Sequence, residues 1–334
     1  MNCSPEEGRA EIDLSFVIPV RNDAFGLQRC LDSIRRATRD VATSEIIVVD
    51  NGSTDGSTEV ARLNGCRLYV VPHERVGALR NMGASAARGR LVAFIDADHE
   101  LSMEWVQAAI DAMRDPATSA VGAAYTPPSA GSWVQRTYDA LRDHRLGRRS
   151  VSWLGSGNLV VRRDVFQRAG GFDVSLETCE DVDLCRRIRA THGLVINDER
   201  LHSIHYGDPS TLYSLFKSEL WRGRDNLRVS LREPLTLRGL PSVIIPVVGL
   251  ALLGFVTIAS GLGRFGAAGG ALTLFLALSA IRAWHMRRRG DVPLHHALAV
   301  ALTYDAARAL ALVMRVRHRR AKIGRSLGGL ASKS

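Results

Sequence analysis

Two carboxylates that stand two positions apart, Asp96 and Asp98, are the first residues whose types and spacing indicate chemistry. They directly follow a strongly apolar run at residues 91–95. Hard oxygen ligands of this kind suit Mg²⁺ or Mn²⁺ carrying a diphosphate, and such a metal neutralises the charge that builds on a departing nucleoside diphosphate. A structural explanation is also open, because Asp98 could instead cap a following helix that contains Trp105.

Two more polar segments follow apolar runs earlier in the chain. Residues 19–23 end the first run, and residues 50–57 follow the second. The Asn-Gly and Asp-Gly pairs of the second segment are also turn dipeptides, and Ser53 or Asp55 could cap a helix. No glycine-rich dinucleotide fingerprint follows the first run, and the sequence contains no phosphate-binding P-loop motif. We therefore expect neither of those nucleotide sites.

The elements that must position these segments can be predicted from hydrophobic periodicity. Apolar runs lie at residues 14–20, 45–49, 67–71 and 91–95. Between the first two, apolar side chains recur at helical spacing, at Leu27, Cys30, Leu31 and Ile34. Alternating strands and helices predict an α/β fold with a mostly parallel sheet. Ligands of such sheets bind beyond the carboxyl ends of the strands, where all three polar segments are predicted to lie.

A series of motifs extends these segments into a family pattern. They are FVIPVRN at 16–22, IVVDNGSTD at 47–55, RNMG at 80–83, FIDAD at 94–98, GN at 157–158, GGFD at 170–173 and EDVDLCRR at 180–187. In this order the chain resembles family 2 glycosyltransferases of the GT-A fold over about residues 14–226. The resemblance implies a Rossmann-like, mostly parallel sheet with flanking helices.

The resemblance implies that the donor side of the site lies at the strand ends. The nucleotide-binding residues implied are Pro19, Arg21, Asp50, Arg80 and Asp96, with Asp50 near the base and Asp96 facing the ribose or the metal. Asp98 is implied as the direct ligand of Mg²⁺ or Mn²⁺. His205 resembles a histidine that contacts the metal or diphosphate in some relatives, although a lone histidine is as often structural. His202 is a weaker candidate.

A second acidic pair, Glu180 and Asp181, opens a predicted helix. Acidic residues at a helix N-terminus are favoured by the helix dipole without any catalytic purpose. Inverting sugar transfer, however, requires a carboxylate that removes the proton from the acceptor hydroxyl. By resemblance this base is Asp181, with Glu180 as the alternative.

The resemblance also implies an acceptor side formed by Trp153, Gly157 and Asn158, where a flat aromatic ring can stack on a sugar. Core packing explains Trp153 equally well. Arg222 and Arg224 are candidates for the diphosphate because guanidinium groups bind phosphate in a bidentate way, and an ordinary basic helix face is the alternative. Processive relatives carry Gln-x-x-Arg-Trp near this point, and its absence favours the addition of one sugar per encounter.

The net charge of +10 on 334 residues is unevenly distributed. Residues 264–334 hold thirteen basic and two acidic side chains, so residues 1–263 are nearly neutral. Positive charge beside apolar segments is typical of membrane topology rather than of nucleic-acid binding, so we expect no nucleic-acid partner. Five cysteines without a Cys-x-x-Cys pair indicate reduced thiols. Residues 1–13 lack a signal-peptide core, and we expect the first domain to stay where it is made.

An uncharged stretch at residues 239–263 is long enough to cross about 30 Å of hydrocarbon. A second, at residues 265–281, is at the lower limit for a span, but Arg264 and Arg282 could snorkel at its ends. The three arginines at 287–289 would fix that end on the cytoplasmic side. The sequence thus predicts a membrane hairpin with both ends inside, and a buried helical pair in a soluble protein is the alternative. Residues 294–314 are neither a clean interfacial helix nor a clean span, and an Asp305–Arg308 pair could let them pack on the hairpin.

Together these patterns predict a cytosolic GT-A domain at residues 1–235, a transmembrane hairpin at 236–290 and a basic membrane-associated helix and tail at 291–334. We expect a metal-dependent inverting glycosyltransferase at the inner or plasma membrane. Its partners would be a nucleotide-sugar donor, a lipid-linked or glycan acceptor, and membrane lipids. A membrane-bound nucleotidyltransferase and a non-catalytic scaffold of the same fold are the alternatives.

Overall fold

The computed structural model describes residues 12–142, 144, 147–191, 193–232 and 240–328. Its contacts divide the chain into two compact units. The first, here called the sheet unit, comprises Met1–Pro128 and Asp143–Gly207, and the second, the helical unit, comprises Ser129–Arg142 and Asp208–Ser334. The predicted domain boundaries at residues 235 and 290 remain predictions, because a compact unit and a functional domain are different divisions of a chain.

The sheet unit is built around an eight-stranded sheet with the order β3-β2-β1-β4-β8-β6-β9-β7. Its strands are β1 Leu14–Val20, β2 Ser44–Asp50, β3 Arg67–Val70, β4 Leu91–Ile95, β6 Thr118–Gly122, β7 Arg148–Ser150, β8 Asn158–Arg162 and β9 Leu194–Asp198. Strands β1 to β4 pair in parallel, and β8 is antiparallel to both of its neighbours. The four predicted runs thus coincide with β1 to β4, and the predicted mostly parallel sheet is confirmed.

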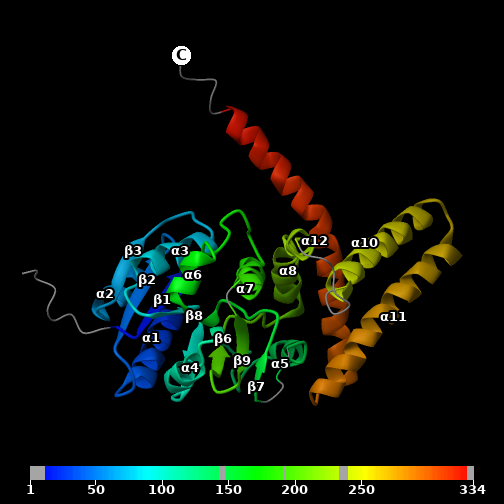
Figure 1. The fold of residues 1–334 in the computed structure, drawn as a ribbon. Helices are drawn as coiled ribbons and strands as arrows, with labels where there is room; N and C mark the ends of the chain where they lie inside the picture. Colours follow the sequence, from blue (N-terminus) through cyan, green and yellow to red (C-terminus); the bar gives the residue numbers. More distant parts are fainter. Residues whose placement is uncertain (1–11, 143, 145–146, 192, 233–239, 329–334) are drawn as a thin grey trace, which may run out of the picture. The chain divides into compact units, whose positions relative to one another are not determined.

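Helices cover both faces of this sheet (Figure 1). They are α1 Ala24–Thr38, α2 Ser57–Leu63, α3 Val76–Ala86, α4 Trp105–Met113, α6 Arg163–Arg168 and α7 Glu180–Thr191. Successive residues of β1 point to opposite faces, so Phe16 and Ile18 join the core under α1 and α4, whereas Val17 joins the core under α3 and α7. Burial on both faces explains why the strand sequences are continuously apolar.

A second, two-stranded ribbon pairs β5 His99–Leu101 antiparallel to β10 Ser203–His205. In its register His99 is the direct partner of His205, and Ile204 is the partner of Glu100. Three residues, 96–98, separate the end of β4 from the start of β5, so this ribbon starts at the carboxyl edge of the main sheet. It therefore brings residues from the end of the sheet unit back to the Asp96-Ala97-Asp98 segment.

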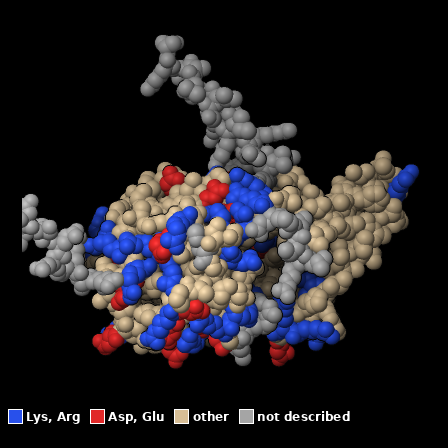
Figure 2. All heavy atoms as spheres, in the orientation of Figure 1, with Lys and Arg blue, Asp and Glu red and all other residues tan. Residues whose placement is uncertain are grey.

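The helical unit contains α5 Trp133–Asp139, α8 Leu212–Arg222, α9 Asn226–Ser230, α10 Leu240–Gly261, α11 Phe265–Arg289 and α12 Leu294–Gly328. The break between α10 and α11 lies where the sequence predicts it. Helix α10, helix α11 and the Leu294–Val313 part of α12 are each long and apolar enough to cross a membrane. Basic residues gather at the ends of the α10–α11 pair, while its sides carry almost no charge (Figure 2).

Helix α12 packs against α10 and α11, as the sequence suggests, but its buried carboxylate has other partners than expected. Asp305 accepts hydrogen bonds from Ser279 Oγ at 2.9 Å and Arg282 Nε at 2.8 Å. Arg308 Nε instead donates to Glu219 Oε2 of α8 at 2.7 Å. The expected Asp305–Arg308 pair is therefore replaced, because buried Asp305 and partly buried Arg308 face neighbouring helices that offer complementary charges.

Candidate functional site

The loops after β1 and β2 hold each other at the carboxyl edge of the sheet. Val20 pairs with Asp50 in register, so both strands end side by side. The backbone N–H of Asn22 donates to Ser53 Oγ at 2.9 Å, and the N–H of Thr54 donates to Asn22 Oδ1 at 2.8 Å. Asp55 accepts from the backbone N–H of Ser57 at the start of α2, but the N-cap residue of that helix is Gly56, so Asp55 does not occupy the capping position.

Three predicted nucleotide residues lie at this edge in different surroundings. Pro19 is buried within β1, whereas Arg21 is exposed beyond its end. Asp50 is fully buried, and its Oδ1 accepts the N–H of Ser53 at 2.8 Å. Its Oδ2 is buried and has no hydrogen-bond partner among the described residues. A buried carboxylate oxygen with spare acceptor capacity is suited to an N–H or O–H donor of a ligand.

Arg80 joins the Asp96 segment to the Glu180 segment. Its guanidinium is 3% exposed and donates to Asp96 Oδ1 at 2.6 Å and to Glu180 Oε1 at 2.8 Å. Burial alone would lower the pKa of Arg80, but the charges of Asp96 and Glu180 outweigh it and raise the pKa. One guanidinium thus bridges two carboxyl groups from segments 84 positions apart and fixes their separation.

Replacing Arg80 by Met should destabilise the fold, because Glu180 would stay buried beside Asp96 and Asp181 without its cation. We expect the free energy of unfolding, measured by urea denaturation at pH 7, to fall by about 3–5 kcal/mol. Arg62→Met is the matched control, since Arg62 lies on the surface. Equal stability of both variants would show that the buried network contributes nothing.

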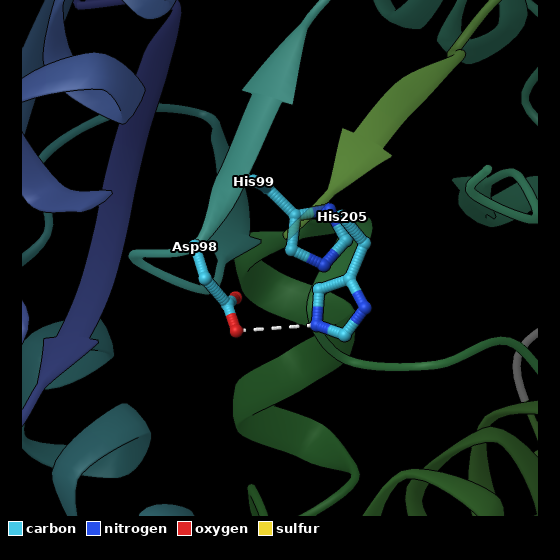
Figure 3. Close-up of side chains that lie close together, drawn as sticks. All are labelled: Asp98, His99 and His205. Carbon is cyan, nitrogen blue, oxygen red and sulfur yellow. Dashed lines mark ion pairs between the residues drawn. The ribbon is translucent and has the colours of Figure 1, made fainter. Parts of the chain in front are cut away.

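Asp98, His99 and His205 form a cluster whose ligand atoms lie within 4.8 Å of one another (Figure 3). Asp98 Oδ2 is 3.2 Å from His205 Nε2, and the rings of His99 and His205 have centroids 4.6 Å apart. His99 Nδ1 is 3.0 Å from Ser203 Oγ, which orients its ring. Burial opposes the charge on Asp98, but the hydrogen bond and charge of His205, with that of His99, lower its pKa to about 2.

The donor set and its surroundings fit a divalent cation such as Mg²⁺ or Mn²⁺. Asp98 is ionised at neutral pH, and its Oδ1 is buried without a hydrogen-bond partner among the described residues. Gly207 leaves the space beside it open, since a Cβ at that position would overlap Asp98 Oδ2. Asp96 lies outside the cluster and bonds to Arg80, so its role as a second ligand remains a prediction. Asp98 caps no helix, because Glu104 precedes α4.

His99 is the residue that sequence reasoning missed. It follows Asp98 directly, but a histidine beside an aspartate carries no signal by itself. Only the ribbon register, which pairs residues 106 positions apart, places it opposite His205. His202, the weaker candidate, lies elsewhere, with Nε2 at 2.9 Å from Thr126 Oγ1.

Asp181 and its neighbour Glu180 lie in different surroundings. Glu180 is buried against Arg80 and Ser156, whereas Asp181 remains partly exposed at the first turn of α7. Burial, followed by the charge of Glu180, raises the pKa of Asp181 to about 7. The backbone N–H of Val182 holds its Oδ1 at 2.8 Å. Such a carboxyl is suited to proton transfer near neutral pH.

The three predicted acceptor residues fall into different environments. Trp153 is 50% exposed, so its ring is free of the core packing that was the alternative. Gly157 lies against the metal side, because a Cβ there would stand 2.6 Å from Asp96 Oδ2. Asn158 is buried, accepts from Trp105 Nε1 at 2.8 Å and donates to the carbonyls of Ala123 and Leu201. The side-chain amide of Asn158 thus links Trp105 of α4 to the backbone at Ala123 and Leu201.

Arg222 and Arg224 belong to the helical unit. Arg222 Nη1 donates to the hydroxyl of Tyr138 at 2.8 Å and to Glu219 Oε1 at 3.1 Å. It is therefore engaged in a buried network with α5 and α12. The role of both arginines as diphosphate ligands remains a prediction.

Comparison with known proteins gives a consistent result. Residues 15–169 match the family model described as glycosyl transferase family 2. The chain is 28% identical over 239 residues to the glycosyltransferase AglE of Haloferax volcanii, covering 67% of this chain and 76% of that one. It is 29% identical over 277 residues to the pre-mycofactocin glycosyltransferase of Mycobacterium tuberculosis, covering 78% of this chain and 56% of that relative.

Among solved structures, the mannosyltransferase PcManGT from Pyrobaculum calidifontis, determined with GDP-Man and Mn²⁺, has a similar fold. The TM-score is 0.58 at 17% identity, and the alignment covers 93% of this chain and 88% of that one. At this identity the likeness concerns the fold. The motifs, the family match and the sheet architecture agree that residues 15–169 form a family 2 glycosyltransferase domain, and the chain has a GT-A-like fold followed by three helices apolar enough to span a membrane.

Proposed function

We propose that this protein is a metal-dependent, inverting glycosyltransferase. It moves a sugar from a nucleotide-diphosphate donor to a lipid-linked or polysaccharide acceptor at the cytoplasmic face of a membrane. The observation that carries the proposal is the Asp96–Arg80–Glu180 bridge, with distances of 2.6 and 2.8 Å. It links the Asp-Ala-Asp segment to the segment of Asp181, so that donor activation and proton removal occur in one site.

Each side chain has a chemical task in this reaction. Asp98, His99 and His205 would hold the cation, and a cation bound there would supply positive charge for a departing diphosphate. Asp50 accepts a hydrogen bond from the nucleotide through its buried, unpartnered Oδ2. Asp181 removes the proton from the acceptor hydroxyl while that oxygen attacks the anomeric carbon opposite the diphosphate, which inverts the configuration. Arg80 holds the Glu180 side chain in place beside this base.

The membrane part of the proposal is supported by α10 and α11. Both helices are apolar enough to span, and the arginines at the end of α11 favour a cytoplasmic location for that end. An enzyme tethered in this way meets lipid-linked acceptors at a high effective concentration. We therefore assign the acceptor to the membrane or to a growing glycan beside it, with one sugar added per encounter.

The proposed base predicts the pH dependence of transfer. Because the pKa of Asp181 is raised to about 7, the group is protonated and inactive as a base below that value. We expect kcat/KM to rise with pH through about 7 and then to level off. Stability runs the opposite way: the folded state binds the proton more tightly than the unfolded state, so this contribution is present below pH 3.8 and is lost above 7. Initial rates and urea denaturation between pH 5 and 9 measure the two trends.

A binding screen with UDP-, GDP- and dTDP-sugars in the presence of Mn²⁺ tests the proposed function. We expect one nucleotide sugar to bind and to be hydrolysed slowly or transferred to a lipid-linked acceptor. Binding of nucleoside triphosphates with release of pyrophosphate would instead identify a nucleotidyltransferase. Absence of any nucleotide binding would identify a non-catalytic scaffold of the same fold.

A further inference from the structure

Tyr206 directly follows the ribbon that carries His99 and His205. Its backbone N–H donates to the carbonyl of Asp98 at 3.0 Å. This bond extends the pairing of β5 with β10 by one step beyond the His99–His205 pair. The backbone at Tyr206 thus holds Asp98 opposite His205.

The side chain of Tyr206 is held on two sides. Its hydroxyl donates to Glu100 Oε2 at 2.9 Å, and Glu100 Oε1 accepts from Arg36 of α1 at 3.2 Å. The guanidinium of Arg29, also on α1, lies 3.3 Å from the centroid of the Tyr206 ring. Arg29 and Arg36 stand seven positions apart and so share one face of the helix.

The contacts of Tyr206 lie next to the point where the chain leaves the sheet unit. The sheet unit ends at Gly207 and the helical unit begins at Asp208. Asp208 is anchored at once: its Oδ1 accepts from Arg142 at 2.6 Å and its carbonyl accepts from Gln135 at 3.0 Å. Only Tyr206 and Gly207 separate this anchor from His205.

We propose that Tyr206 is a positioning residue of the metal site. Its side chain, held between Arg29 and Glu100, fixes the backbone that presents Asp98 and His205 to a divalent cation. Tyr206 itself donates no ligand atom. The inference rests on the metal site of the proposed function, and it adds that the affinity of this site depends on a contact with α1, outside the cluster.

The test is a titration of the full-length protein with Mn²⁺ alone, without donor, following free Mn²⁺ by electron paramagnetic resonance. Tyr206→Leu should raise the Kd for Mn²⁺ about 10- to 100-fold, the usual loss when a group that orients a ligand is removed. Tyr206→Phe keeps the ring under Arg29 and loses only the hydroxyl, so we expect a smaller rise of about two- to tenfold. His205→Ala should abolish most binding, and Tyr213→Leu, at a 70% exposed tyrosine of α8, should change nothing.

A purely structural role of Tyr206 would lower the unfolding temperature and leave the Kd for Mn²⁺ unchanged. If Tyr206→Leu fails to fold, Tyr206→Phe and Arg29→Met carry the same test. Wild-type affinity in the folded Tyr206 and Arg29 variants, with loss in His205→Ala, overturns the positioning role and leaves the proposed function intact. Wild-type affinity in His205→Ala overturns both, because the cluster would then not be the metal site.

Discussion

Replacing Asp181 by Asn is expected to reduce the rate of sugar transfer by about 10²- to 10⁴-fold, the range that general-base catalysis contributes. The amide keeps the size of the side chain and its place at the start of α7, but it cannot accept the acceptor's proton. Since Asp181 contacts neither the metal cluster nor Asp50 in the described structure, the Kd for the nucleotide sugar should change by less than about twofold. Single-turnover transfer and donor titration measure the two quantities separately.

Two comparisons sharpen this result. Asp164→Asn, on the surface of α6, is the matched control and should leave both quantities unchanged. Glu180→Gln removes a charge that Arg80 needs, so it should lower stability as well as rate. If Asp181→Asn lowered donor affinity as much as it lowers the rate, Asp181 would be a donor-binding residue and not the base.

The same substitution should stabilise the protein above neutral pH. There the wild-type carboxylate is charged in surroundings that raise its pKa to about 7, and the neutral amide avoids the repulsion by Glu180. Residues that serve catalysis often oppose stability in this way. A higher midpoint of urea denaturation for Asp181→Asn than for wild type at pH 8 is the expected observation, with Asp164→Asn again as control.

The strands of the sheet and the helices after it were predictable because each is encoded by the hydrophobic pattern of its own residues. The apolar runs at residues 14–20 and 91–95 coincide with β1 and β4, since a strand covered on both faces must be continuously apolar. Asp96 and Asp98 lie just beyond β4, because the apolar run that forms this strand ends at Ile95. The break between α10 and α11 was predictable from an arginine and glycines between two uncharged stretches.

The partners of the site residues were not predictable, because they depend on contacts between distant segments. Arg80 meets Glu180 100 positions away, and His99 meets His205 only through the ribbon register. The amide of Asn158 forms hydrogen bonds with Trp105 and with two backbone carbonyls. No single motif in the sequence reveals these partners. Likewise, residues 129–142 join the helical unit through tertiary packing, although they lie within the predicted catalytic domain.

Replacing Asp98 by Ala, or removing divalent cations with a chelator, is expected to lower transfer and donor hydrolysis by about 10²- to 10³-fold, corresponding to several kcal/mol of charge stabilisation in the transition state. Among the described residues Asp98 is the only carboxylate of the cluster, so its loss leaves two imidazoles, which hold Mn²⁺ weakly without an anionic ligand. Mn²⁺ should restore the chelated wild type and fail to restore the variant.

Comparison with the Arg80 bridge tests whether the effect of Asp98→Ala is specific to the metal. Asp98 makes no contact with the Arg80 bridge, so Asp98→Ala should retain the stability that Arg80→Met loses. Asp164→Ala controls for the loss of a surface carboxylate. Full turnover of Asp98→Ala in the presence of a chelator would mean that the charge on the leaving diphosphate is balanced by the protein's own cations. Exposed Arg21 and the arginines 222 and 224 would then be the residues to replace next, because guanidinium groups can take over that task without a metal.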